Sequence, residues 1–302
     1  MKQDRVLVGL GEILWDVFAS GPRFGGAPAN FACSAAGLAT EAFEVHIAGA
    51  VGNDTLGTQA RKALLDHHVK TDALSIVDYP TGQVLVSLDG DGHASYEFAA
   101  NSAWDHLEWS DILESVAKTT DVVCWGTLGQ RSEISKQTIR RFVASTPTHA
   151  LRILDINLRS PFWNQEIIHN SLAMANVLKL NETELPVVSE MLEFAGSELD
   201  VMRQIMSKYS LQVVALTRGA NGSVLIRDDN EHSEVPGLPT TVIDTVGAGD
   251  SFTACLALGL LQGLTLDAIN RWASQVAAFV CSQPGATPEL PSHLRMAQQS
   301  FA

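Results

Sequence analysis

The sequence predicts an α/β protein in which a mostly parallel central sheet is covered by helices on both faces. Short apolar runs of strand length recur along the chain, and segments of helical character follow most of them. Each of these runs ends in glycine or polar residues, as buried parallel strands do. The chain of 302 residues is 46% apolar and 18% charged, which suits one large domain over 1–302.

Composition and charge exclude several classes of function. The chain carries 34 acidic and 20 basic residues, whereas binding to nucleic acid or to an anionic membrane needs clustered Lys and Arg. No apolar run approaches the roughly 18 residues of a membrane span, and we expect no signal peptide at the amino terminus. The four cysteines form no Cys-x-x-Cys pair, so we expect core thiols and a cytoplasmic protein.

The first strand is expected over 6–11, an apolar run that ends in glycine. Asp16 follows among apolar residues, where its carboxylate is either a solvated strand edge or an acceptor for sugar hydroxyls. Two glycines ending at Gly26 then allow close backbone approach, and a helix is expected over 28–38, because proline suits its first turn. Asn30 in that turn is either part of an ordinary capped helix or a polar group aimed at a ligand above the glycines.

A strand over 46–51 and a helix over 54–68, capped by Asp54, come next. The pattern then changes over 81–99, where apolar and polar residues alternate on both sides of the turn signal Asp-Gly-Asp-Gly at 89–92. We interpret this segment as a half-exposed antiparallel hairpin that covers a site. Its exposed sheet face is compatible with a homodimer.

The second half of the chain alternates regularly between strands and helices. The strands are expected over 121–126, 151–156, 176–180 and 211–217, with a helix over 132–145. Ligands of parallel α/β sheets bind at the carboxyl ends of the strands. We therefore expect the polar segments 155–159, 181–184 and 218–222, which follow three of these strands, to lie at one binding edge.

A small-residue turn leads into the last predicted helix, an apolar run that starts near Asp250 and ends before Gly263. Such a turn leaves backbone amides unpaired at the positive end of the helix dipole, which makes an anion site. Asp250 beside this site is either ordinary dipole complementation or a general base for a hydroxyl that attacks phosphorus.

Common alternatives are missing from the sequence. It has no Gly-Lys dipeptide for a Walker A loop, no complete Gly-x-Gly-x-x-Gly fingerprint and no Gly-x-Ser-x-Gly elbow. A phosphoryl-transfer site without a P-loop remains, and it needs a metal partner and a nucleotide pocket. Asn181 and Glu184 are candidates for Mg²⁺, and Thr217, Gly219 and Gly222 are candidates for the nucleotide.

Three motifs in this order resemble the signatures of the ribokinase-like carbohydrate kinases, the PfkB family, over essentially the full chain. Residues 244–250 look like the carboxyl-side signature, 25–30 look like the amino-side signature, and 181–184 match the Asn-x-x-Glu metal motif. The resemblance implies a ribokinase-like three-layer fold with a discontinuous β lid at approximately 12–24 and 75–105.

The resemblance also implies roles for individual residues. Asp250 would be the catalytic base, beside an anion hole formed by the amides of Gly247, Ala248 and Gly249. Sugar hydroxyls would be held by Asp16, Gly26 and Asn30. ATP would be contacted by Thr217, Gly219, Gly222 and Gly249, with Gly285 on the adenine side. Mg²⁺ would be held by Asn181 and Glu184, and K⁺, which only some members use, by Asp244 and Val246.

Other segments resemble bacterial fructokinase-type members, namely 11–16, 103–105 and 155–159. Arg159 would then reach a phosphate or the sugar, unless it is a solvated loop arginine. We expect an ATP-dependent kinase that phosphorylates a hydroxymethyl group of a small sugar, with fructose first. Ribose, 2-keto-3-deoxygluconate and nucleosides are alternative substrates, and a non-catalytic sugar- or nucleotide-binding regulator is the alternative from another class.

Overall fold

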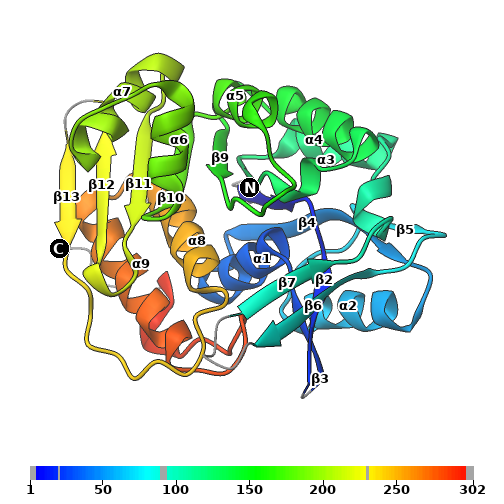
Figure 1. Ribbon diagram of the computed structural model, residues 1–302. Helices are drawn as coiled ribbons and strands as arrows, with labels where there is room; N and C mark the ends of the chain where they lie inside the picture. The colour runs from blue at the N-terminus through cyan, green and yellow to red at the C-terminus, as the bar shows by residue number, and fades with distance from the viewer. Residues whose placement is uncertain (1–4, 20, 89–93, 229–230, 297–302) are drawn as a thin grey trace.

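The structure is a computed structural model in which residues 5–19, 21–88, 94–228 and 231–296 are described. Its main feature is a nine-stranded sheet in the order β13-β12-β11-β10-β9-β8-β1-β4-β5 (Figure 1). The strands are β1 (Arg5–Leu10), β4 (Phe43–Gly52), β5 (Leu74–Val77), β8 (Val122–Trp125), β9 (Leu151–Asp155), β10 (Val177–Asn181), β11 (Val213–Thr217), β12 (Ser223–Arg227) and β13 (His232–Val235).

The mostly parallel sheet expected from the sequence is confirmed. All neighbouring pairs from β5 to β11 are parallel, and β8 and most of β1 are buried, as a sheet covered on both faces requires. The edge differs from the expectation. The glycine-bearing segment 218–222 after β11 is a tight turn, and the strands β12 and β13 that continue the sheet antiparallel were not predicted.

Helices cover both faces of this sheet and give the three layers. One core cluster joins the sheet to α1 (Ala27–Leu38), α2 (Thr55–Asp66), α8 (Ala248–Leu261) and α9 (Leu266–Cys281). The other joins it to α3 (Asp111–Thr119), α4 (Glu133–Ser145), α5 (Gln165–Met174), α6 (Glu184–Leu192) and α7 (Glu198–Tyr209). The expected core thiols are confirmed for Cys33, Cys124 and Cys255, which are buried.

A second sheet of four strands, in the order β3-β2-β6-β7, lies against one side of the large sheet (Figure 1). Its strands are β2 (Leu14–Phe18), β3 (Gly21–Gly25), β6 (Gly82–Leu88) and β7 (Ala94–Phe98). The expected hairpin is present, since β6 and β7 pair antiparallel. The turn signal at 89–92 lies outside the described residues.

Helices begin and end at the residues that the local sequence signals predict. Asp54 caps α2 by accepting a hydrogen bond from the Gly57 amide at 2.7 Å. Gly263 follows α8 in the left-handed region, with φ of 68°, where glycine is favoured. Within the stretches that the structure describes, no helix combines the length and apolar character needed to cross a bilayer.

Candidate functional site

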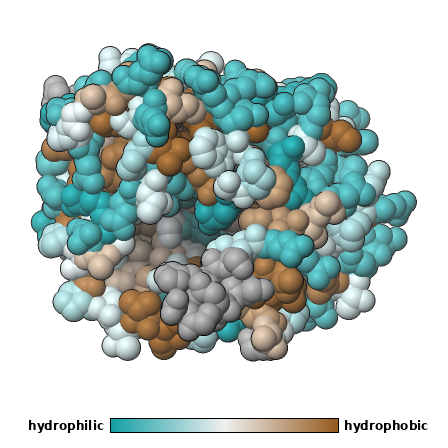
Figure 2. All heavy atoms as spheres, viewed as in Figure 1, coloured by the Kyte–Doolittle hydropathy of each residue, from teal (hydrophilic) through white to brown (hydrophobic). Residues whose placement is uncertain are grey.

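A cavity of about 300 Å³ lies between the carboxyl edge of the large sheet, the small sheet and the start of α8. The face shown in Figure 2 is hollowed near its centre, between the two halves seen in Figure 1. The lining residues are Glu12, Leu14, Asp16, Phe18, Gly26, Ala27, Asn30, Val84, Tyr96, Phe98, Leu128, Asn157, Arg159, Lys179, Asn181, Thr245, Val246, Gly247, Gly249 and Asp250.

The cavity brings together many of the residues expected at the site. Those that line it are Asp16, Gly26, Asn30, Arg159, Asn181, Val246, Gly247, Gly249 and Asp250. Those that do not line it are Thr217, Gly219, Gly222, Glu184, Asp244, Ala248 and Gly285. The first group contains the residues expected at the sugar and the expected base, and the second contains most of the residues expected at the nucleotide and the cations.

The start of α8 forms the expected turn of small residues. Gly247 is its N-cap with φ of 80°, and a Cβ there would lie 2.2 Å from the Ala286 carbonyl oxygen, so only glycine fits. No side chain caps this end. The first amides of a helix have no partner within it. The Ala248 amide reaches only the Thr245 carbonyl, at 3.4 Å, and a helix end of this kind is suited to bind an anion.

Asp250 lies in the first turn of α8 with its carboxylate held from another helix. The side-chain amide of Asn30 donates to Asp250 Oδ2 at 2.8 Å, across 220 positions of the sequence. Burial raises the pKa of Asp250 to about 6, assisted by the nearby Asp155 charge and opposed by Asn30, Lys179 and Arg159. Asp250 is therefore an oriented carboxylate that is ionised at neutral pH and can accept a proton.

Asp16 faces the cavity from β2 because alternate residues of a strand point to the same face of its sheet. Leu14, Asp16 and Phe18 of β2 all line the cavity, as do Tyr96 and Phe98 of β7. Burial raises the pKa of Asp16 to about 6. The carboxylate is thus placed where hydroxyl groups of a small ligand could donate to it.

Arg159 lines the cavity but is exposed to solvent at its mouth. Its guanidinium donates to the Leu158 carbonyl at 3.1 Å. Its positive charge opposes the rise in the pKa values of Asp16 and Asp250 that burial causes. Arg159 is therefore an exposed loop arginine at the cavity, and its contact with a phosphate or the sugar stays a prediction.

Glu184 is fixed at the carboxyl edge by two backbone amides. Its Oε1 accepts from Leu158 at 2.9 Å and its Oε2 accepts from Asn181 at 2.8 Å. The Asn181 side-chain oxygen is itself engaged by the amides of Thr183 and Glu184. Mg²⁺ usually keeps several waters and takes one or two carboxylates plus substrate phosphates. One oriented carboxylate fits such an ion, and no three-residue metal cluster occurs among the described residues.

The residues expected at the nucleotide lie on the neighbouring strand. Thr217 pairs directly with Asn181 in the sheet register. The turn that follows has φ of 51° at Gly219 and 91° at Gly222, values that favour glycine. Arg218 in this turn forms an ion pair with Glu234 of β13 at 2.7 Å.

The carboxylate of Asp244 has a partner at each oxygen. Oδ1 accepts from the Val246 amide at 3.1 Å, and Oδ2 accepts from the Gly285 amide at 3.2 Å and from Arg23 at 3.0 Å. The guanidinium therefore supplies the positive charge that K⁺ would bring. This donor set does not fit a K⁺ ion without displacement of Arg23.

Two charged residues that line the cavity, Glu12 and Lys179, were not singled out from the sequence. Glu12 is 1% exposed, and its Oε2 has no hydrogen-bond partner. Lys179 Nζ forms an ion pair with Asp155 Oδ1 at 3.0 Å. A charged residue inside an apolar strand run could have pointed to Lys179, because buried lysines need partners.

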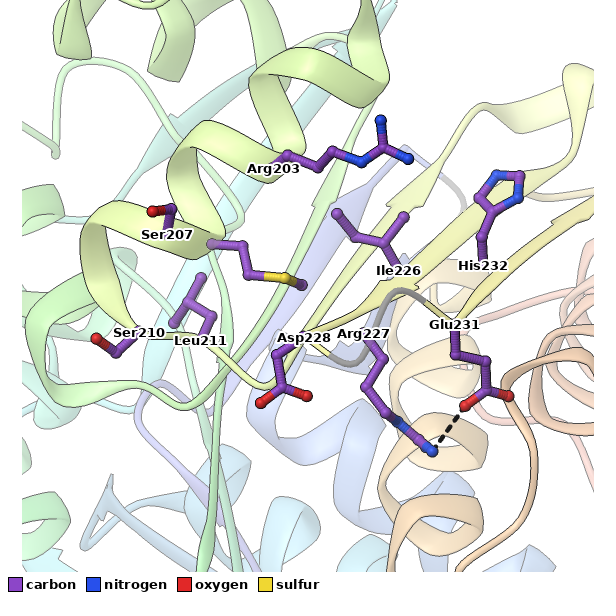
Figure 3. A pocket seen from close by; sticks show the side chains of 10 residues that line it. Arg203, Ser207, Ser210, Leu211, Ile226, Arg227, Asp228, Glu231 and His232 are labelled. Carbon is purple, nitrogen blue, oxygen red and sulfur yellow. Dashed lines mark ion pairs between the residues drawn. The ribbon is translucent and has the colours of Figure 1, made fainter.

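A second cavity, of about 450 Å³, lies between α7 and the edge strands β12 and β13 (Figure 3). It is at the opposite edge of the sheet, because it contains Leu211, just before β11, and Arg227 at the end of β12. Arg227 already pairs with Glu231 at 2.7 Å. The first cavity is the better candidate, since it holds the oriented carboxylate and the helix-end amides.

Residues 12–293 match the family described as pfkB family carbohydrate kinase. The chain is 26% identical over 274 residues to the ATP-dependent 6-phosphofructokinase of Thermoanaerobacterium thermosaccharolyticum, covering 89% of this chain and 82% of that protein. It is 29% identical over 294 residues to the fructokinase of Escherichia coli, with 89% of each chain covered.

A crystal structure of fructokinase with bound ATP from Xylella fastidiosa superposes with a TM-score of 0.83 at 20% identity. The superposition covers 97% of this chain and 96% of that chain. This likeness confirms the ribokinase-like three-layer fold. Because the family match spans nearly the whole sequence, the chain belongs to the pfkB family of carbohydrate kinases.

Proposed function

We propose that this carbohydrate kinase transfers the γ-phosphoryl group of ATP to a hydroxymethyl group of a small sugar, with fructose as the first candidate. The observation that carries the proposal is the Asp250 carboxylate. It is half-buried at the wall of a cavity, oriented by Asn30, and next to the first amides of α8. A base beside an anion site is the arrangement that phosphoryl transfer to a hydroxyl needs.

The residues of the chain would act as follows. Asp16 and the Asn30 side-chain oxygen, which is buried without a hydrogen-bond partner, would accept hydrogen bonds from sugar hydroxyls. Asp250 would take the proton of the attacking sugar hydroxyl as the hydroxyl oxygen approaches the γ-phosphorus in line with the ADP leaving group. The amides of Gly247, Ala248 and Gly249 would then stabilise the charge on the transferred group.

The nucleotide would lie along the same edge of the sheet. We propose that Thr217, Gly219 and Gly222 contact its phosphates and ribose and that Gly285 lies on the adenine side. Glu184, with Asn181, would orient Mg²⁺ through the water molecules of the ion. When bound, Mg²⁺ supplies charge neutralisation for the phosphates.

The small sheet would act as a lid over the sugar. Its inner face carries Tyr96 and Phe98 toward the cavity, and Phe98 also packs edge-on against Phe162 at 5.3 Å between ring centroids. A lid of this kind excludes water, which would otherwise compete with the sugar for the phosphoryl group.

The choice of fructose rests on names and short segments. The relatives include a fructokinase and a 6-phosphofructokinase, which differ in substrate. Membership of the family therefore does not fix the substrate, and ribose, 2-keto-3-deoxygluconate and nucleosides stay as alternatives. A silent regulator is disfavoured, because binding alone does not need an oriented carboxylate base beside an anion site. The cytoplasmic location expected from the sequence stays a prediction.

The test is ADP release from Mg-ATP across a panel of sugars and nucleosides, starting with fructose. Asp250→Asn is the control. We expect fructose to give the strongest signal, and the variant to lose at least about 10³-fold in kcat while it still binds ATP. A signal with another sugar would overturn the substrate alone. Substantial turnover by Asp250→Asn would overturn the assignment of the base.

A further inference from the structure

Lys179 is a buried cation in the floor of the cavity. It lies in the middle of β10, between leucines, and its side chain is 7% exposed. Its ammonium contacts Asp155 Oδ1 at 3.0 Å, and Asp155 Oδ2 accepts from the Thr253 hydroxyl at 2.8 Å. Thr253 lies one turn after Gly249 on α8. The ion pair therefore ties two central strands to the first turns of the helix that carries Asp250.

The ammonium also lies directly beneath the anion site. A Cβ built on Gly249 would come 2.9 Å from Lys179 Nζ, so a side chain at this position would displace the ammonium. Lys179 lines the cavity itself. A positive charge at this point adds to the partial positive charge of the helix end.

The cavity has few other cations to balance its acids. Asp250 faces Asn30 from α1, Asp155 from β9 and Lys179 from β10, and Glu12 and Arg159 also act on this group of residues. Arg159 is exposed, whereas Lys179 is enclosed and screened little by salt. Among the residues that the structure describes, Lys179 is thus the enclosed positive charge next to the Asp250 carboxylate.

We infer that Lys179 is a positioning residue for the proposed phosphoryl transfer, which holds the start of α8 in place through Asp155 and keeps the Asp250 carboxylate ionised for an approaching hydroxyl. The inference rests on the proposed function. Opposite charges favour the ionised form of a carboxylate and like charges disfavour it. Lys179 and Asp155 therefore act on Asp250 with opposite signs, which gives the inference a signature that a purely structural role lacks.

The experiment is a charge cycle read by the pH dependence of kcat/KM. The wild type, Lys179→Met, Asp155→Asn and the double variant are assayed with Mg-ATP and the sugar identified by the panel. We expect Lys179→Met to move the midpoint of the acidic limb upward by about one pH unit and Asp155→Asn to move it downward by a similar amount. The double variant should return close to the wild-type midpoint, because it removes both charges.

The cycle stays informative if one variant does not fold. Lys179→Met leaves Asp155 buried without its cation, which is strongly destabilising. In that case the step from Asp155→Asn to the double variant measures the same removal of the ammonium and should raise the midpoint. Asp105→Asn is the matched control, since Asp105 forms an equally enclosed ion pair with Arg131 away from the cavity lining. It should leave the midpoint unchanged.

The outcomes separate the two proposals. A wild type that releases no sugar-dependent ADP overturns the proposed function itself. An active wild type whose limb stays at one pH in all four proteins, with only lower stability in the variants, overturns the role of Lys179. Midpoints that shift in the same direction in both single variants would also overturn it, because a general loosening of the site would act that way.

Discussion

At the scale of single residues, Asp250 shows how burial raises the pKa of a carboxylate toward neutral pH, as its proposed role of base needs. Removal from water raises its pKa to about 6, and the hydrogen bond from Asn30 limits the rise. Below this pKa the carboxyl is protonated and cannot accept the proton of a sugar hydroxyl. Above it the base is present in full, and catalysis gains nothing more from a further rise in pH.

This gives a prediction for the free enzyme. We expect log kcat/KM to fall below about pH 6, and with a slope approaching two, because burial also raises the pKa of Asp16 to about 6. Stopped assays from pH 5 to 8 measure the limb. Asp16→Asn should reduce the slope to one at a similar midpoint. A wild-type profile that stays flat down to pH 5 would contradict both assignments.

Burial also raises the pKa of Glu12, and this affects the pH dependence of stability rather than of catalysis. Desolvation raises its pKa to about 7, above the ordinary 4.5, with a smaller contribution from the charge of Asp250. The folded protein thus holds this proton more tightly than the unfolded chain does. Its contribution to stability is complete below about pH 4.5 and is lost as the pH rises through 7.

We therefore predict that Glu12→Gln removes this loss. Relative to the wild type, the variant should gain roughly 1–3 kcal/mol in the free energy of unfolding between pH 5 and pH 8, since one pKa unit corresponds to about 1.4 kcal/mol. Urea unfolding at the two pH values measures the difference. Any effect of amide packing is the same at both pH values and cancels. An unchanged pH dependence would show that Glu12 is ionised without cost.

At the scale of elements, an ion pair joins the small sheet to the loop before α8. Arg23 of β3 contacts Asp244 at 3.0 Å, with 44% of the arginine side chain exposed. Arg23 also lies opposite Asp16 in the register of β2 and β3. The sheet thus brings its own cation to the carboxylate that K⁺ would otherwise neutralise.

We predict that the wild type works equally well when K⁺ is replaced by a large organic cation, whereas Arg23→Ala becomes dependent on K⁺. ADP release with both salts measures the first effect, and the shift of the unfolding midpoint with K⁺ measures binding without turnover. The pair is exposed, so the variant itself should lose only about 0.2–1 kcal/mol. Arg271→Ala, which breaks an exposed pair with Asp267, is the matched control. A wild type that requires K⁺ would reject the role of Arg23.

Elements with local signals could be predicted from the sequence, and those set by distant partners could not. The caps at Asp54 and Gly263 are local, and the strand runs are apolar because they are buried. By contrast, the turn at 218–222 looks like the end of any sheet strand, so the antiparallel edge was missed. The contact of Asn30 with Asp250 spans 220 positions, and only the resemblance of both motifs to one family placed them together.

At the scale of the whole molecule, the two faces of the small sheet differ in their surroundings. Its inner face lines the cavity, whereas Leu85 on the outer face is 49% exposed and pairs in register with Val17. Exposed apolar groups on a sheet face favour association with another copy of the same sheet. A homodimer through the small sheet would cover this face and hold the two lids against each other.

We predict that the wild type sediments at twice the chain mass over roughly 1–50 μM in analytical ultracentrifugation and that Leu85→Glu shifts it to the monomer, because a buried unpaired charge is costly in an apolar interface. Ile112→Glu is the matched control, since Ile112 is 55% exposed on α3, on another part of the surface. It should leave the mass unchanged. A monomeric wild type would reject the dimer, and equal dissociation by both variants would show that the effect is not specific to the small sheet.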